Sequence, residues 1–190
     1  DVTGATRPDI DSFAQALATE VATALKDLKY HDADLAMTQS TLTLNRRVPD
    51  KKRLAWAKEK VAALGDNKPK TQPDIYAREA IFLHDQPQRE LKLQAIRIGD
   101  VAIAAIPNEI YALTGLKIKA MSPLPQTFTI GLANGSEGYI PPPEQHKLGG
   151  YTTWPARTAA LEPEAEPKIV RATLPLLETV TGRRRRSPQS

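Results

Sequence analysis

The stretch VAIAAI at residues 101–106, followed at once by Pro107-Asn108-Glu109, decides the fold of this chain. An uninterrupted apolar run of this length predicts a β-strand that is buried on both faces and therefore lies inside a sheet. Just before it, apolar and polar residues alternate over residues 91–95, and Gly99-Asp100 separates the two segments. This pattern predicts a β-hairpin with a tight two-residue turn. Pro107 ends the second strand and leaves polar residues just past its carboxyl end.

Elements on both sides of this hairpin place the chain in the mixed α/β class. Apolar residues at intervals of three and four predict five helices, over residues 8–28, 49–64, 73–84, 109–119 and 164–180. Pro175 is expected to interrupt the last of these. Alternating or apolar segments predict further strands over residues 34–45 and 126–132. Helices and strands interleave, so we expect β-sheet layers flanked by helices.

The charge of the chain is concentrated at one end. The formal net charge is +4. The rest of the chain has 22 basic and 22 acidic residues, so the whole net charge comes from four consecutive arginines: Arg183, Arg184, Arg185 and Arg186. A domain that binds nucleic acid through a basic face spreads its lysines and arginines more widely. We therefore expect one domain over residues 1–182 and a basic, disordered tail over residues 183–190, with polyanion binding through the tail as the least favoured function.

Composition excludes several classes of site. The chain has no cysteine, which excludes disulfides, thiolate nucleophiles and cysteine-ligated metal centres. No apolar run approaches the roughly 20 residues of a membrane helix, so no transmembrane segment is expected. The chain begins at Asp1 and not at methionine, so we expect that it was processed or cut from something longer.

Two stretches bring polar residues to predicted strand ends, where ligand sites in α/β sheets gather. Glu109 follows the buried strand, although its spacing alone favours an ordinary residue at the start of a helix, where the helix dipole stabilises a negative charge. The strand over residues 126–132 runs into a glycine-rich loop that ends at Tyr139. Glycines let the backbone approach a ligand closely, but a surface loop with an anchoring tyrosine explains the same composition.

These residues resemble the signature of the neutral, non-lysosomal ceramidases. Gly131-Leu132-Ala133-Asn134-Gly135, then Gly138-Tyr139-Ile140 and Pro143-Glu144, are similar to the family's strand end, its "G-Y" pair and its short "P-E" helix start. Ile106-Pro107-Asn108-Glu109 resembles the family's strand that ends in a proline and a glutamate. The specific part of the resemblance covers residues 91–155, and over the N-terminal third it rests on element order.

The resemblance implies a zinc-dependent amidohydrolase that cleaves the N-acyl amide bond of ceramide-like lipids. The family binds Zn²⁺ through two histidines, a glutamate and a tyrosine; Glu109 matches the glutamate and Tyr139 matches the tyrosine. None of the histidines His31, His84 and His146 lies in a matching motif. The resemblance therefore implies half of a zinc site here, with two histidine ligands expected upstream.

A further catalytic candidate stands at the start of the chain. Asp1-Val2-Thr3-Gly4 resembles the remainder of a family motif of the type "G-D-V-S-P-N", whose serine is a proposed nucleophile or substrate-binding group. Thr3 then stands at the position of the serine, although the Pro-Asn that follows in the family is missing. Thr3 and Tyr139 are thus the catalytic candidates.

Residues 1–182 are accordingly expected to form the C-terminal portion of a ceramidase-like catalytic domain. Such an incomplete domain is expected to be inactive alone. Its implied partners are the missing N-terminal half, an N-acyl sphingoid lipid and, through peripheral contact, a membrane surface. The resemblance also implies secretion or a periplasmic location, with the cytoplasm left open. A non-catalytic binding domain of the same ancestry is the alternative.

Overall fold

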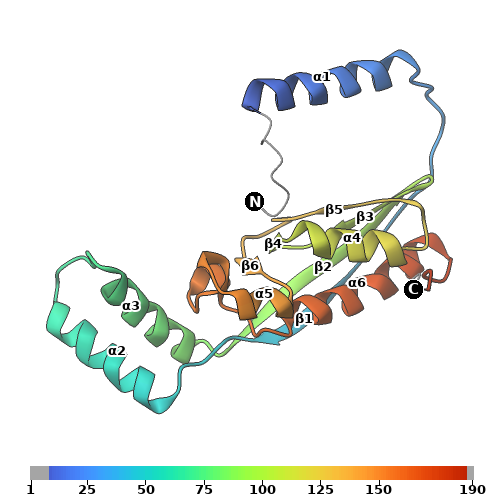
Figure 1. Cartoon of the computed structure of the whole chain (residues 1–190). Coiled ribbons are helices and arrows are strands. Elements are labelled where there is room, and N and C mark those ends of the chain that lie inside the picture. The colour runs from blue at the N-terminus through green and yellow to red at the C-terminus, as the bar shows by residue number, and fades with distance from the viewer. Residues whose placement is uncertain (1–8, 188–190) are drawn as a thin grey trace. The chain divides into compact units, whose positions relative to one another are not determined.

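The structure is a computed structural model that describes residues 9–187, in which helices and strands interleave along the chain (Figure 1). It divides into two compact units, Asp1–Ala33 and Asp34–Ser190. Over the described residues, every helix is too short or too polar to cross a membrane.

Over its described residues, 9–33, the first unit contains one helix, α1 (Ile10–Lys26). Asp9 caps its first turn, because the Asp9 carboxylate accepts a hydrogen bond from the Ser12 backbone N–H at 2.8 Å. This confirms the predicted helix. The apolar residues that recur at intervals of three and four are not buried within this unit.

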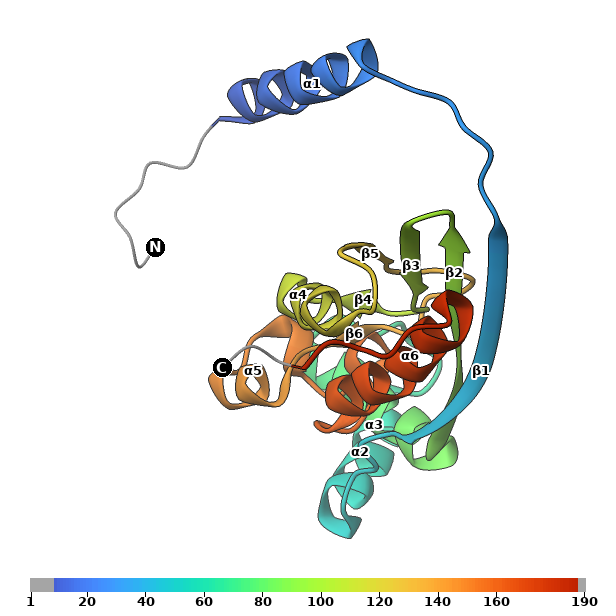
Figure 2. The same ribbon diagram turned by 90° about the vertical axis from the view of Figure 1, so that its right-hand side faces the viewer.

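The second unit is built on a four-stranded mixed sheet with the order β1-β2-β3-β5 (Figures 1 and 2). The strands are β1 (Leu35–Asn45), β2 (Gln88–Ile98), β3 (Val101–Ala105) and β5 (Gln126–Ile130). The pairs β1–β2 and β2–β3 are antiparallel, whereas β3 and β5 run parallel. The predicted hairpin and the central place of its second strand are therefore confirmed. Gly99 has a positive φ of 56°, which the tight turn requires.

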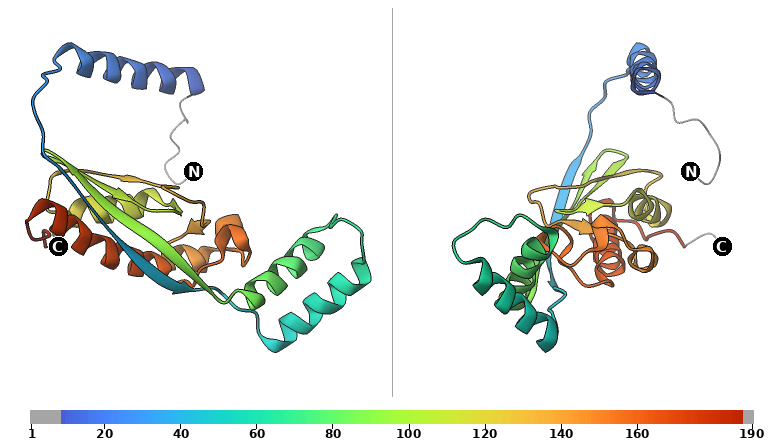
Figure 3. Two further views of the ribbon diagram at one scale, coloured as in Figure 1. Left: turned by 180° about the vertical axis from the view of Figure 1, so that it is seen from behind. Right: turned by 60° about the vertical axis from the view of Figure 1, so that its left-hand side comes forward.

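Helix α6 (Ala165–Thr181) packs along one face of this sheet (Figure 3). Leu91 and Leu93 from β2 and Ile169 and Leu177 from α6 form the centre of the core and are fully buried. The expected interruption at Pro175 is wrong, since the helix runs through it. Burial of Leu174 and Leu177 against the sheet outweighs the loss of the backbone hydrogen bond that Pro175 cannot donate.

Helices α2 (Lys51–Leu64) and α3 (Gln72–Asp85) form a hairpin that extends beyond one end of the sheet (Figure 3). Small residues let the two helices approach closely, with Ala57 facing Ala77 and Ala80 in a second small core. A capping box starts α3: Thr71 and Asp74 each hydrogen-bond the other's backbone N–H.

The remaining elements connect β3 to β5, through β4 and α4, and β5 to α6, through the other four. They are β4 (Glu109–Ile110), α4 (Ala112–Met121), β6 (Tyr139–Ile140), α5 (Pro143–Leu148) and the 3-10 turns η1 (Tyr151–Thr153) and η2 (Arg157–Ala159). The helix expected from residue 109 begins only at Ala112. Glu109 lies instead in β4, because its backbone N–H donates to the carbonyl of Gly138 at 3.0 Å and so pairs with a strand.

Two arginines of the arginine-rich end contact neighbouring helices, while the disorder expected for residues 183–190 stays a prediction. The Arg186 guanidinium donates to the Ser122 carbonyl at 2.8 Å and to the Lys119 carbonyl, both at the C-terminal end of α4. Arg185 forms an ion pair with Glu178 of α6 at 3.1 Å. A cation at a helix C-terminus is favoured by the helix dipole, which explains the position of Arg186.

Candidate metal and substrate site

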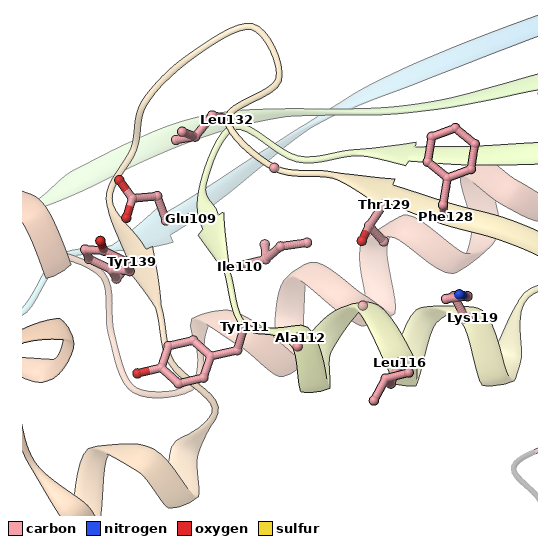
Figure 4. A pocket seen from close by; sticks show the side chains of 12 residues that line it. Glu109, Ile110, Tyr111, Ala112, Leu116, Lys119, Phe128, Thr129, Leu132 and Tyr139 are labelled. Carbon is pink, nitrogen blue, oxygen red and sulfur yellow. The ribbon is translucent and has the colours of Figure 1, made fainter. Parts of the chain in front are cut away.

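The two residues predicted as metal ligands lie side by side in the structure (Figure 4). Parallel strands β3 and β5 end at the same edge of the sheet, and the short strands β4 and β6 pair just beyond that edge. In this pair Glu109 is the direct register partner of Tyr139. The expectation that both strand ends share one edge of the sheet is therefore confirmed.

The glycine-rich loop holds the segment that carries Glu109 from two sides. On one side, the Leu132 backbone N–H donates to the Asn108 carbonyl at 3.0 Å. On the other, the Glu137 N–H donates to the Pro107 carbonyl at 2.8 Å. These backbone hydrogen bonds hold Glu109 in position, although it does not belong to a long helix or strand.

Asn108 is a positioning residue that the sequence marked only as the neighbour of Glu109. Its side chain is fully buried, and its Nδ2 donates to the carbonyls of Glu137 at 3.0 Å and Gly138 at 3.2 Å. These two bonds tie the backbone before Tyr139 to the backbone before Glu109. Arg89 steadies the same loop, since its Nε donates to the Glu137 carboxylate at 2.6 Å.

Glu109 disfavours the ionisation of the Tyr139 phenol. A hydrogen bond with the Glu109 carboxylate, together with the charge of that carboxylate, raises the pKa of Tyr139 above its ordinary value of 10.0. The phenol is therefore a hydrogen-bond donor at neutral pH. Its ring also packs edge to face against Tyr151, with the ring centroids 6.0 Å apart.

A groove of about 690 Å³ runs from this pair along α4 and β5 (Figure 4). Glu109 and Tyr139 lie at one end, and apolar side chains line much of the rest: Ile110, Leu116, Phe128 and Leu132. We call this the first groove. The sequence did not reveal it, because its residues come from separate elements and follow no common period.

Two backbone features shape the end of β5 beside Glu109, where Gly131 and Leu132 line the first groove. Leu132 adopts the left-handed region with φ of 55°, which is costly for a leucine and is found where surrounding structure enforces it. A Cβ at Gly131 would lie 3.1 Å from the carbonyl oxygen of Asn108. The strand end and the Glu109 segment can therefore pass each other closely only because residue 131 is a glycine.

The described residues do not complete a zinc site. Within residues 9–187, no three histidine, cysteine or acidic side chains come together in a way that could hold a metal ion. Glu109 and Tyr139 offer two oxygen donors, whereas zinc takes four ligands. His84 contacts Asp85 at 3.0 Å, and burial lowers the pKa of His146 on α5. Thr3 lies outside the described residues.

Comparison with known proteins identifies the fold. No family model and no curated protein matches the sequence. Neutral ceramidase from Pseudomonas aeruginosa aligns with 100% of this chain and 36% of its own, with a TM-score of 0.53 and 14% identity. A ceramidase complexed with C2 aligns with 53% of this chain and 16% of its own, with a TM-score of 0.43 and 16% identity.

The chain thus spans about a third of the length of the Pseudomonas aeruginosa ceramidase structure that it matches over its whole length. At this identity the match concerns the fold, and it agrees with the α/β class and with the sheet and flanking helices described above. The chain therefore has the α/β fold of part of a neutral ceramidase.

Proposed function

We propose that this chain supplies the C-terminal part of the catalytic domain of a ceramidase-like zinc amidohydrolase. The substrate is the N-acyl amide bond of a ceramide-like lipid. The observation that carries the proposal is the pairing of Glu109 with Tyr139 across β4 and β6, at the end of an apolar groove. A hydrolase for a lipid amide needs both parts: polar groups at the scissile bond and an apolar surface for the chain next to it.

Glu109 and Tyr139 have distinct roles in this proposal. The Glu109 carboxylate is a metal ligand and balances the charge of the ion. The Tyr139 phenol oxygen is the second metal ligand from this chain, and it also steadies the oxygen that becomes negative when the amide carbonyl is attacked. Zinc, when bound, lowers the pKa of water toward about 7 and so supplies the attacking hydroxide.

The remaining two zinc ligands come, in this proposal, from histidines outside the 190 residues. Two facts support this: the described residues offer only two donors, and the matched ceramidase is much longer than this chain. The chain alone is accordingly expected to bind zinc weakly and to turn over little or no substrate. Export of the protein, which the resemblance implies, stays a prediction.

The experiment compares the chain alone with a longer protein in which an N-terminal half bearing the paired histidines precedes it. Hydrolysis of a fluorogenic N-acyl amide and zinc content are measured on both. Activity is expected only in the longer protein, with losses of at least about 100-fold in Glu109→Gln and Tyr139→Phe. Glu144→Gln on α5 is the matched control and keeps activity. Tight zinc binding with full turnover by the 190 residues alone would contradict the half-site.

The alternative is a non-catalytic binding domain of the same ancestry. This alternative is favoured by the incomplete set of metal donors among the described residues. If the longer protein lacked the paired histidines, binding without catalysis would be the better explanation. Polyanion binding through the arginine-rich end is less favoured. Arg185 and Arg186 are already engaged by Glu178 and by α4, which leaves less of the charge for phosphates.

A further inference from the structure

A second cavity, of about 520 Å³, lies between α3 and the segment that contains η1 and η2. Aromatic and aliphatic side chains line it: Ile75 and Tyr76 from α3, and Tyr151 and Trp154 from the opposite side. We call it the aromatic cavity. The first groove and the aromatic cavity have no lining residue in common.

A continuous series of edge-to-face ring contacts connects this cavity to the candidate site. Tyr76 contacts Trp154 at 5.8 Å between ring centroids, Trp154 contacts Tyr151 at 6.3 Å, and Tyr151 contacts Tyr139 at 6.0 Å. Tyr139 lines the first groove, whereas Tyr151 lines the aromatic cavity. The Tyr139–Tyr151 pair therefore stands between the two hollows, with Glu109 on the side of the first groove.

The charged groups at the wall of the aromatic cavity are already paired with each other. The Glu79 carboxylate accepts hydrogen bonds from the Arg157 backbone N–H at 2.8 Å and from Arg157 Nη2 at 2.7 Å. Burial alone would raise the pKa of Glu79, but these bonds bring it below its ordinary value. Neither charge is free for a ligand, so the cavity offers aromatic and aliphatic surface to an uncharged, apolar group.

We propose that the aromatic cavity receives one apolar chain of the substrate while the first groove receives the other. The ligand is then a two-armed amphiphile: an amide whose polar link lies at Tyr139 and whose acyl and amine chains diverge on either side of the Tyr139–Tyr151 pair. This inference rests on the proposed function and adds to it that both arms are bound by residues of this chain. A single-chain amphiphile would leave one of the two apolar surfaces in water.

The test uses the fluorescence of Trp154 in the 190-residue chain. The chain has two tryptophans, so Trp56→Phe leaves Trp154 as the only one. The probes are N-hexanoyl-hexylamine carrying a terminal bromine on the acyl chain, and its isomer with bromine on the amine chain, because bromine quenches an indole that it approaches. Saturable quenching by one isomer and not the other is expected. Each methylene added to the quenching arm should improve the affinity about fourfold.

Two variants separate binding in the cavity from unspecific adsorption. Ile75 is 46% exposed on α3, so Ile75→Asp places a charge at the cavity wall with little cost to folding, and it should weaken the quenching affinity at least about 10-fold. Leu148, 78% exposed on α5, lines neither hollow, and Leu148→Asp should change nothing. Equal quenching by both isomers, equal effects of the two variants, or binding of hexyltrimethylammonium in preference to the uncharged amide would overturn the proposal.

The outcome for the cavity can be told apart from the outcome for catalysis. Glu109→Gln should abolish amide hydrolysis in the longer protein but leave the quenching of Trp154 intact, because Glu109 does not line the aromatic cavity. Hydrolysis that depends on Glu109, without any quenching of Trp154, would leave the proposed function standing and refute the second arm. Saturable quenching of Trp154 without any hydrolysis by the longer protein would support the second arm and refute the proposed function.

Discussion

The hydroxyl of Tyr139 and the carboxylate of Glu109 interact across the β4–β6 pair, although each strand has only two residues. Neither side chain is fixed by a long helix or strand of its own. Their positions depend on the surrounding backbone bonds and on Asn108, whose amide joins the two segments. The pair is thus sensitive to any change that separates β6 from β4, and the pKa of Tyr139 reports on its integrity.

Glu109→Gln should lower the pKa of Tyr139 toward its ordinary value of 10.0. The carboxylate raises this pKa by its hydrogen bond and its charge, and glutamine keeps the shape but removes the charge. The titration can be followed by NMR of tyrosine labelled at the ring carbon that bears the hydroxyl, with Tyr139→Phe to assign the signal. Glu144→Gln on α5 should leave the signal unchanged. An identical titration of Tyr139 in wild type and Glu109→Gln would mean that the two groups do not interact.

Removal of the lysine from the ion pair between α4 and α6 should destabilise the protein strongly, because the glutamate of this pair is buried. Lys117 Nζ lies 3.1 Å from one oxygen of Glu166 and 3.3 Å from the other, and the Glu166 side chain is only 1% exposed. Lys117→Met keeps the aliphatic stem but leaves a buried carboxylate without its counter-charge. The free energy of unfolding, measured with urea, should fall by about 3 kcal/mol.

The matched control for this pair is Lys168→Met. Lys168 contacts Glu162 at 2.6 Å, but Glu162 is 19% exposed and water screens the pair more. This variant should lose only about 0.5 kcal/mol. Equal losses in the two lysine variants would show that burial of Glu166 does not determine the cost.

The sequence predicted the regular elements of this fold well, because their signals are local. The hairpin of β2 and β3 follows from alternation and a Gly-Asp turn, and α1, α2 and α3 follow from apolar periodicity and their first residues. The errors lie where tertiary contacts decide. Pro175 predicts an interruption that packing of α6 overrides, and the sequence pattern puts Glu109 in a helix because a two-residue strand has no period to detect.

The candidate site was predictable only in part, for the same reason. Glu109 and Tyr139 stand out in the sequence because they match a family motif and follow predicted strands. The structure places them opposite each other in one strand pair. The role of Asn108 was not predictable, since it depends on carbonyl groups in a loop far along the chain. The first groove and the aromatic cavity likewise combine residues from separate elements, and the sequence carries no signal for such combinations.

The capping box of α3 should give the protein a stability contribution that depends on acidic pH. The hydrogen bond with the Thr71 hydroxyl, together with bonds from the backbone of Thr71 and Lys70, lowers the pKa of Asp74 from 3.8 to about 2. A folded pKa below the unfolded value means stabilisation that is complete above pH 3.8 and lost as the pH falls toward 2. The stability difference between wild type and Asp74→Asn, from urea unfolding, should therefore shrink over this range. A difference that stays constant from pH 5 to pH 2 would contradict the proposed origin of the shift.

Gly138→Ala should separate β6 from β4 and so disrupt the site. Gly138 has φ of 75°, and a Cβ there would lie 2.6 Å from the carbonyl oxygen of Thr158, a backbone atom that cannot move away cheaply. Gly149 has the same φ of 75°, but no atom lies within 4 Å of the position that a Cβ would take, so Gly149→Ala carries the backbone strain without the clash. We expect a loss of about 1 kcal/mol for Gly149→Ala and about 2 kcal/mol more for Gly138→Ala. In Gly138→Ala alone, the pKa of Tyr139 should also fall, because displacement of β6 takes the hydroxyl away from Glu109. Equal destabilisation of the two variants, with the pKa of Tyr139 unchanged in both, would mean that contact with Thr158 does not hold Tyr139 in place.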